Sequence, residues 1–128
     1  LAFVGDLMNE KAVPVIDRAA GGSALALPQT LARAVAEITG VDRVITGHGP
    51  APSPTSRGRP WPMWNEFKEY ADFTRDFVDA AQAAFKAGRT VEQAVAELKL
   101  PEKYKEYRLD GAKAAIETIF AELKDTRR

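Results

Sequence analysis

The chain of 128 residues contains no cysteine and a single histidine, His48. The lack of cysteine excludes disulfide bonds, a cysteine nucleophile and zinc sites built on thiolates. It also fits a reducing compartment, so we expect a cytoplasmic location. One histidine cannot build a metal site or a catalytic triad by itself. Any chemistry at His48 therefore needs partners elsewhere.

The chain also lacks net charge and long apolar runs. Lysine plus arginine and aspartate plus glutamate number 18 each, and balanced charge gives no support for binding to nucleic acid or to an anionic membrane. No apolar run approaches the ~20 residues needed to span a bilayer, and no signal peptide is visible. We therefore expect neither nucleic acid nor a membrane among the partners.

Hydrophobic residues make up 45% of the chain and charged residues 28%, which is typical of a globular domain rather than a disordered segment. The length fits one domain. The chain begins with Leu1 instead of Met, inside an apolar run that is typical of a buried strand. Because natural domains rarely start in mid-strand, we expect a fragment whose missing part lies upstream.

The N-terminal part alternates strand and helix patterns. Residues 1–4 and 43–46 are short apolar runs that predict strands. Residues 11–20 predict a short helix or an irregular loop. Apolar residues at helical spacing predict a helix from Leu27 to about Ile38, with proline in its first turn and Gly40 as its stop.

The C-terminal part is predicted to be helical. The proline-rich residues 50–62 predict a loop. An apolar stripe predicts one long helix from Trp64 to Lys86, and a capping box at Thr90 predicts a second helix to about Leu98. A last helix is predicted to begin near Asp110, a good N-cap.

These patterns predict three regions. They are an α/β portion over residues 1–50, a proline-rich loop over 51–62 and a helical extension over 63–128. The expected fold class is therefore α/β with a predominantly helical C-terminal part, few strands and a helix-rich chain overall.

Asp6 and His48 are the leading candidate site residues. Each follows a short apolar run and adjoins a glycine. If the two strands are neighbours, their ends would bring a carboxylate oxygen and an imidazole nitrogen to within ~2 Å of one ion, the distance at which zinc is bound. Alternatively, Asp6 caps a turn and His48 hydrogen-bonds within its own loop. The spacing alone leaves both interpretations open.

Other motifs give weaker indications. Ser23, Ser53 and Ser56 lie outside any G-x-S-x-G nucleophile elbow, and no phosphate-binding or dinucleotide fingerprint occurs. The Gly-Gly pair before Ser23 would either bind an anion or form a flexible turn, and the turn is favoured.

Two groups of large side chains also have alternative interpretations. Trp61 and Trp64 would line a pocket or, as we favour, anchor the loop on the core. The basic residues Lys103, Lys105 and Arg108 would touch an acidic group or form a solvated face, which is the usual case.

Three segments together carry a resemblance to a known family. They are Phe3-Val4-Gly5-Asp6-Leu7, Gly21-Gly22-Ser23 and Val41-Asp42-Arg43-Val44-Ile45-Thr46-Gly47-His48-Gly49-Pro50. They resemble the C-terminal half of a metallo-β-lactamase-fold hydrolase. The segments Gly88 to Ala94, Leu100 to Tyr104 and Ile119 to Leu123 look like the helical extension of one subgroup, so the resemblance covers nearly the whole chain.

The resemblance implies part of an αββα sandwich and a site with two zinc ions. In that family the aspartate after the strand bridges both metals and the histidine of the Gly-His-Gly turn binds the second, which would make Asp6 and His48 metal ligands. The remaining family ligands lie upstream in an H-x-H-x-D-H motif and a further histidine. We therefore expect no hydrolase activity from this chain alone.

The expected partners are the missing N-terminal half or a second copy of the chain. A partial sheet would leave an apolar face and strand edges exposed. We expect association through residues 1–4 and the long helix. The alternative function is a stand-alone helical interaction or assembly module without catalysis.

Overall fold

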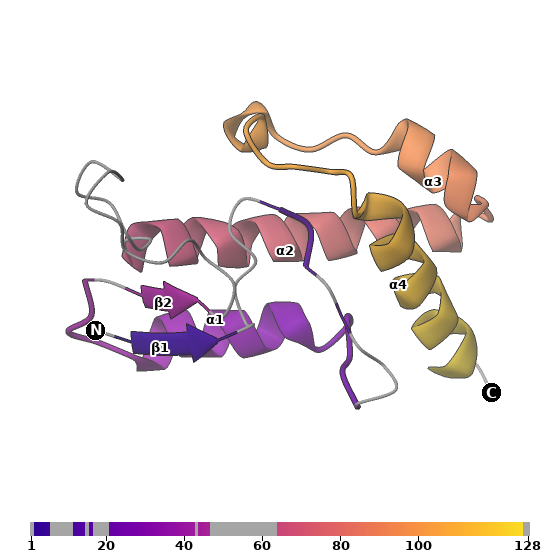
Figure 1. Ribbon diagram of the computed structural model, residues 1–128. Helices are drawn as coiled ribbons and strands as arrows, with labels where there is room; N and C mark the ends of the chain where they lie inside the picture. The colour runs from indigo at the N-terminus through magenta and orange to yellow at the C-terminus, as the bar shows by residue number, and fades with distance from the viewer. Residues whose placement is uncertain are drawn as a thin grey trace.

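The structure is a computed structural model that describes residues 2–5, 12–14, 16, 21–42, 44–46 and 64–126. Helices dominate this part of the chain (Figure 1), which confirms the predictions of few strands and a helix-rich chain with a helical C-terminal part. The elements in chain order are β1 (Ala2–Gly5), α1 (Leu27–Glu37), β2 (Val44–Thr46), α2 (Trp64–Lys86), α3 (Val91–Glu97), the 3₁₀ turn η1 (Glu102–Tyr104) and α4 (Ala112–Thr126).

Strands β1 and β2 form a parallel pair. Their arrows lie next to each other and point the same way in Figure 1. A parallel pair needs a crossover connection, and α1 lies within it, so the predicted strands and helix form one β–α–β unit. The register is Ala2 opposite Val44, Phe3 opposite Ile45 and Gly5 opposite Thr46, with an irregularity between Phe3 and Gly5.

Helix α1 starts where the sequence predicts, with Pro28 in its first turn. Leu31 is fully buried, whereas Ile38 is 40% exposed. The helix ends because Ile38 adopts an extended backbone conformation. Gly40, with φ of 75°, makes a turn two residues later. The helix thus ends within one residue of the predicted Ile38, and Gly40 follows it in the left-handed conformation that is common for glycine just beyond a helix.

Helix α2 has the predicted bounds and provides most of the core. The aromatic side chains of its predicted stripe, Phe67, Tyr70, Phe73 and Phe77, are fully buried. Burying one such side chain stabilises the fold by about 1.5–3 kcal/mol. Helices α1, α3 and α4 all pack against α2. The stripe is therefore covered by the chain's own helices.

The connection from α2 to α3 follows the predicted signals closely. Gly88 has φ of 77°, and the amides of Gly88 and Arg89 donate to carbonyls in the last turn of α2, as in a Schellman motif. Thr90 then opens α3 with a complete capping box. Its hydroxyl accepts from the Gln93 amide at 3.1 Å, and its amide donates to the Gln93 side chain at 3.0 Å.

The segment between α3 and α4 is held against α2 by an aromatic cluster of Phe73, Tyr104 and Tyr107. The Phe73 ring stacks on Tyr107 at 4.2 Å and meets the edge of Tyr104 at 5.3 Å, centroid to centroid. The Tyr104 hydroxyl donates to Asp76 at 2.9 Å. These contacts fix a segment that would otherwise be a long connection with little regular structure.

Helix α4 begins at Ala112, two residues after Asp110, near which the sequence predicts its start. The Ala112 amide donates to the carbonyl of Leu109 in a turn. Asp110 therefore belongs to the turn rather than to the N-cap. Its apolar face lies in the core, since Ile116, Ile119 and Phe120 are buried.

The described residues from both sides of the predicted loop contribute to one core. Val13, Leu31 and Val44 belong to the same apolar cluster as the aromatic residues of α2. The Val13 amide also donates to the Arg108 carbonyl at 3.2 Å. Residues 12–14 and 16 are not helical, which agrees with the irregular alternative there. The boundaries 1–50, 51–62 and 63–128 remain predictions, with 51–62 outside the described residues.

Among the helices that the structure describes, none is long and apolar enough to cross a membrane. The longest, α2, carries Glu66, Lys68 and Arg75 among its charged residues, and such charges are expensive in the hydrocarbon core of a bilayer.

Candidate functional site

The predicted metal ligands Asp6 and His48 lie outside the described residues. The strands before them are described. Asp6 directly follows Gly5, the last residue of β1, and His48 comes two residues after Thr46, the last residue of β2. Gly5 and Thr46 are register partners in the parallel pair. The condition set by the sequence, that the two strands be neighbours, is therefore met.

Because the strands are parallel, the carboxyl ends of β1 and β2 lie at the same edge of the sheet. That edge is where α/β proteins bind their ligands. Paired strands lie about 4.8 Å apart, and two residues of chain reach at most about 7 Å. Both candidate segments thus start from the same edge. The register irregularity before Gly5 is a feature that often occurs beside functional sites.

The chain supplies few metal ligands. Within the described ranges no group of three or more histidine, aspartate or glutamate side chains is placed to hold an ion. The whole sequence has one histidine and no cysteine. Catalytic zinc sites use three protein ligands and an open position. Asp6 and His48 alone therefore do not amount to a complete site of this kind.

Ser23 and the two residues after it bind a carboxylate of the chain itself. The Ala24 amide donates to Glu122 Oε1 at 2.7 Å, and the Leu25 amide and the Ser23 hydroxyl donate to Glu122 Oε2 at 3.0 Å each. Gly21 lies in a turn with φ of 90°, in agreement with the favoured turn interpretation of the glycine pair, while Ser23 and the two residues after it supply the donors. Ser53 and Ser56 lie outside the described residues.

Sequence reasoning missed Glu122, although the helical pattern contains a signal. Glu122 lies one turn after Ile119 and next to Leu123, on the apolar side of α4, and it is only 7% exposed. A carboxylate among core residues requires hydrogen-bond donors. The pattern would therefore have predicted a buried partner. It gave no means of finding that partner about a hundred residues away.

The aromatic and basic candidates have structural roles where they are described. Trp64 stacks on Phe67 at 5.0 Å and is half-buried against the core, in agreement with the anchoring interpretation, while Trp61 lies outside the described residues. Lys103, Lys105 and Arg108 are exposed. The Lys103 ammonium lies 5.0 Å from the ring centroid of Tyr104, as expected for a solvated basic face.

Two phenols have strongly perturbed ionisation. Burial raises the pKa of Tyr104 well above its ordinary value of 10.0, and its hydrogen bond to Asp76 raises that pKa further. Burial likewise raises the pKa of Tyr107, and the negative charge of Glu69 adds to the effect. Both phenols therefore stay protonated at neutral pH and serve as hydrogen-bond donors rather than as bases.

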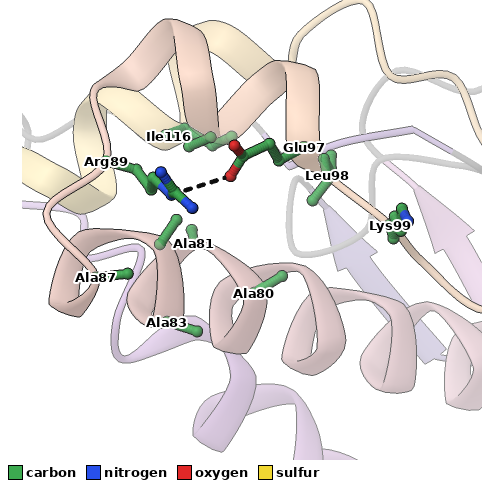
Figure 2. Close-up of a pocket in the computed structure, with 11 residues that line it drawn as sticks. Ala80, Ala81, Ala83, Ala87, Arg89, Glu97, Leu98, Lys99 and Ile116 are labelled. Atoms are coloured by element: carbon green, nitrogen blue, oxygen red, sulfur yellow. Dashed lines mark ion pairs between the residues drawn. The ribbon is translucent and has the colours of Figure 1, made fainter.

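A hollow of about 370 Å³ lies where α2, α3 and α4 meet (Figure 2). Alanine side chains form much of its lining, with Ile116 and Leu98 beside them. Arg89 Nε and Glu97 Oε2 are joined by an ion pair of 3.1 Å across its rim. Both partners are about half exposed, so the pair contributes at most about 1 kcal/mol. Since alanine offers only apolar contact, we assign this hollow to loose helix packing.

Comparison with known proteins adds no family to these observations. No protein-family model matches the chain, and no curated protein matches it either. The residues and the geometry of the chain therefore carry the functional argument.

Proposed function

We propose that this chain is the C-terminal portion of a zinc-dependent hydrolase of the metallo-β-lactamase type. It forms part of an αββα sandwich, contributes Asp6 and His48 as metal ligands and is inactive alone. The supporting observation is the parallel pairing of β1 and β2 with Gly5 opposite Thr46. This register starts the two ligand-bearing segments from the same sheet edge.

The two proposed metal ligands, Asp6 and His48, limit the activity that this chain can have by itself. Asp6 is a hard oxygen ligand suited to bridging two cations, and His48 is a nitrogen ligand suited to zinc. Two ligands hold zinc weakly compared with a full set. The remaining ligands belong to the upstream half in this proposal, and no catalytic step can be assigned to this chain by itself.

Zinc titration of the purified chain tests the two ligands. Competition with a chromophoric chelator is expected to show weak binding by the wild type. Asp6→Asn and His48→Gln are each expected to weaken zinc binding by at least about tenfold. Changing a residue that only supports a metal ligand already lowers metal affinity by about 10- to 100-fold, so loss of a ligand itself should cost at least as much. Glu117→Gln, at an exposed position on α4, is the matched control and is expected to bind as the wild type does.

Hydrolase assays of the chain and the coding sequence upstream of it provide two further tests of the proposed function. The wild-type chain with zinc is expected to leave a lactam, a thioester and a phosphodiester unhydrolysed, and robust zinc-dependent turnover would refute the proposed inactivity. The coding sequence upstream of Leu1 is expected to encode an H-x-H-x-D-H motif. Its absence, or unchanged zinc affinity in both ligand variants, would contradict the proposal.

The second candidate function is an assembly module without catalysis, acting through association of strands. Among the described residues β1 and β2 pair only with each other, whereas parallel sheets are normally larger and covered on both faces. The α2 stripe is buried inside the chain, so this candidate places association at the backbone edges of the strand pair. A self-associated species without bound metal, measured by sedimentation, would favour this candidate over the first.

A further inference from the structure

Glu122 joins the last helix to the segment that leads into α1. Its two carboxylate oxygens accept three hydrogen bonds of 2.7–3.0 Å from Ser23, Ala24 and Leu25. Two of these donors are consecutive backbone amides, which the turn before α1 directs toward one point. Converging amides of this kind form an anion-binding concavity, and bonds to an ionised acceptor are roughly twice as strong as neutral ones.

The same carboxylate supplies what α1 lacks at its N-terminus. The N-cap residue Ala26 has no side chain that can cap, and the first turn contains no acidic residue. The Ser23 hydroxyl accepts from the Ala26 amide at 3.1 Å while donating to Glu122. Negative charge near a helix N-terminus is stabilising. Glu122 therefore acts on α1 as a cap provided by another helix.

We propose that Ser23, Ala24 and Leu25 form a carboxylate-binding site whose resident ligand is Glu122, and that this contact is a reversible latch between α4 and the start of α1. The ligand class is a carboxylate, because the three donors match its two oxygens. The site does not depend on the proposed hydrolase function.

Two further observations support the reversibility of the contact. Helix α4 has an independent anchor, since Ile116 and Ile119 are buried and Phe120 meets Phe85 edge-on at 5.2 Å. The contact can therefore open while the helix stays packed. A hollow of about 530 Å³, lined by residues that include Gly21, Gly22 and Glu122, lies beside the contact. Ser23 and Leu25, two of the three donor residues, also line it, so that a small anion can approach the site from this side.

Amide hydrogen exchange in the full chain, followed by NMR, tests the latch. Glu122→Ala is expected to speed exchange at Ala24 and Leu25 by about tenfold or more, the effect of losing a hydrogen bond to a charged group. Amides in the middle of α2 are expected to keep their wild-type rates. Glu117→Gln, on the same helix and exposed, is the control and should change neither set.

Addition of acetate tests the ligand class. In Glu122→Ala, sodium acetate is expected to restore slow exchange at Ala24 and Leu25, whereas sodium chloride at equal ionic strength is not. The resident side chain has the advantage of a high effective concentration, so acetate should act only at high concentration and have no effect on the wild type.

Three results would overturn the proposal. They are unchanged exchange in Glu122→Ala, an equal loss of protection throughout α2, and an acetate effect no larger than that of chloride. If Glu122→Ala does not fold, Ser23→Ala provides the test, because it removes one donor and keeps the carboxylate. It is expected to speed exchange at Ala24 and Leu25 by a few-fold, about the value of one neutral hydrogen bond, and wild-type rates there would equally refute the latch.

Discussion

The helical region over residues 64–126 and the strand-bearing region over residues 2–46 are held together in different ways. Within the first, aromatic rings from α2 and from the segment after α3 pack on one another, and the four phenylalanine and tyrosine residues of the α2 stripe have no exposed surface. The second is attached to the first by the packing of α1 on α2, by buried apolar residues that include Val13 and Val44, and by directional contacts. These contacts include Glu122 with the residues before α1 and Val13 with Arg108.

Apolar burial and hydrogen bonding contribute to the stability of the two regions in different ways. Apolar burial is non-directional and accumulates with area, so the helical region gains stability from every side chain in its core. Hydrogen bonds are local and contribute about 0.5–1.5 kcal/mol each in net terms. The strand-bearing region, which carries the candidate ligands, adds such directional contacts to its apolar packing, and these can be changed one at a time.

Removal of Phe73 should have the largest effect, because it breaks the aromatic cluster on which the helical region depends. Phe73→Ala is expected to lower the free energy of unfolding by about 3–5 kcal/mol, measured by urea denaturation. Lys68→Ala, at an exposed position of the same helix, is the control and should stay within about 0.5 kcal/mol. A loss for Phe73→Ala no larger than for the control would contradict this role.

Leu31→Ala tests the attachment of the strand-bearing region. Leu31 is the fully buried residue of α1, which packs on α2, and its truncation is expected to cost about 2–5 kcal/mol locally. Hydrogen exchange by mass spectrometry should show faster exchange in α1 and little change in α4. Arg33→Ala removes an exposed ion pair with Glu37 and is expected to be nearly neutral. Equal destabilisation of both regions would show that they unfold as one.

Alkaline pH should act mainly on the helical region. The folded-state pKa values of Tyr104 and Tyr107 lie above the unfolded value of about 10. Their contribution to stability is therefore fully present below pH ~10 and is lost as the pH rises through the folded values. We expect tyrosinate absorbance to appear together with loss of helix, followed by circular dichroism.

Tyr104→Phe provides the matched variant for this titration. It keeps the ring in the aromatic cluster and removes the hydroxyl that donates to Asp76. It should weaken the alkaline transition and cost about 1 kcal/mol at neutral pH. Ionisation of the wild-type phenols at ordinary pH while the helices stay intact would contradict the predicted coupling.

The local features of the fold were predictable where a pattern is contained in a few neighbouring residues. The bounds of α2, the capping box at Thr90 and the stop at Gly88 follow from residue spacing and backbone preference. Asp110 located the start of α4 to within two residues, but the cap position itself is Gly111, whose carbonyl accepts from the Ala115 amide. The candidate site was predictable only as two strand ends, since His48 and Asp6 are identified by motif and not by contact.

The sequence by itself determined the helices, the two short strands and the shortage of metal ligands, because periodicity, caps and composition are local or countable properties. Only the tertiary structure decided that β1 and β2 are parallel partners and that Glu122 binds the residues before α1. Both depend on contacts between residues far apart in the chain. Such contacts form when apolar burial brings distant segments together, and no short pattern in the sequence records which segments will meet.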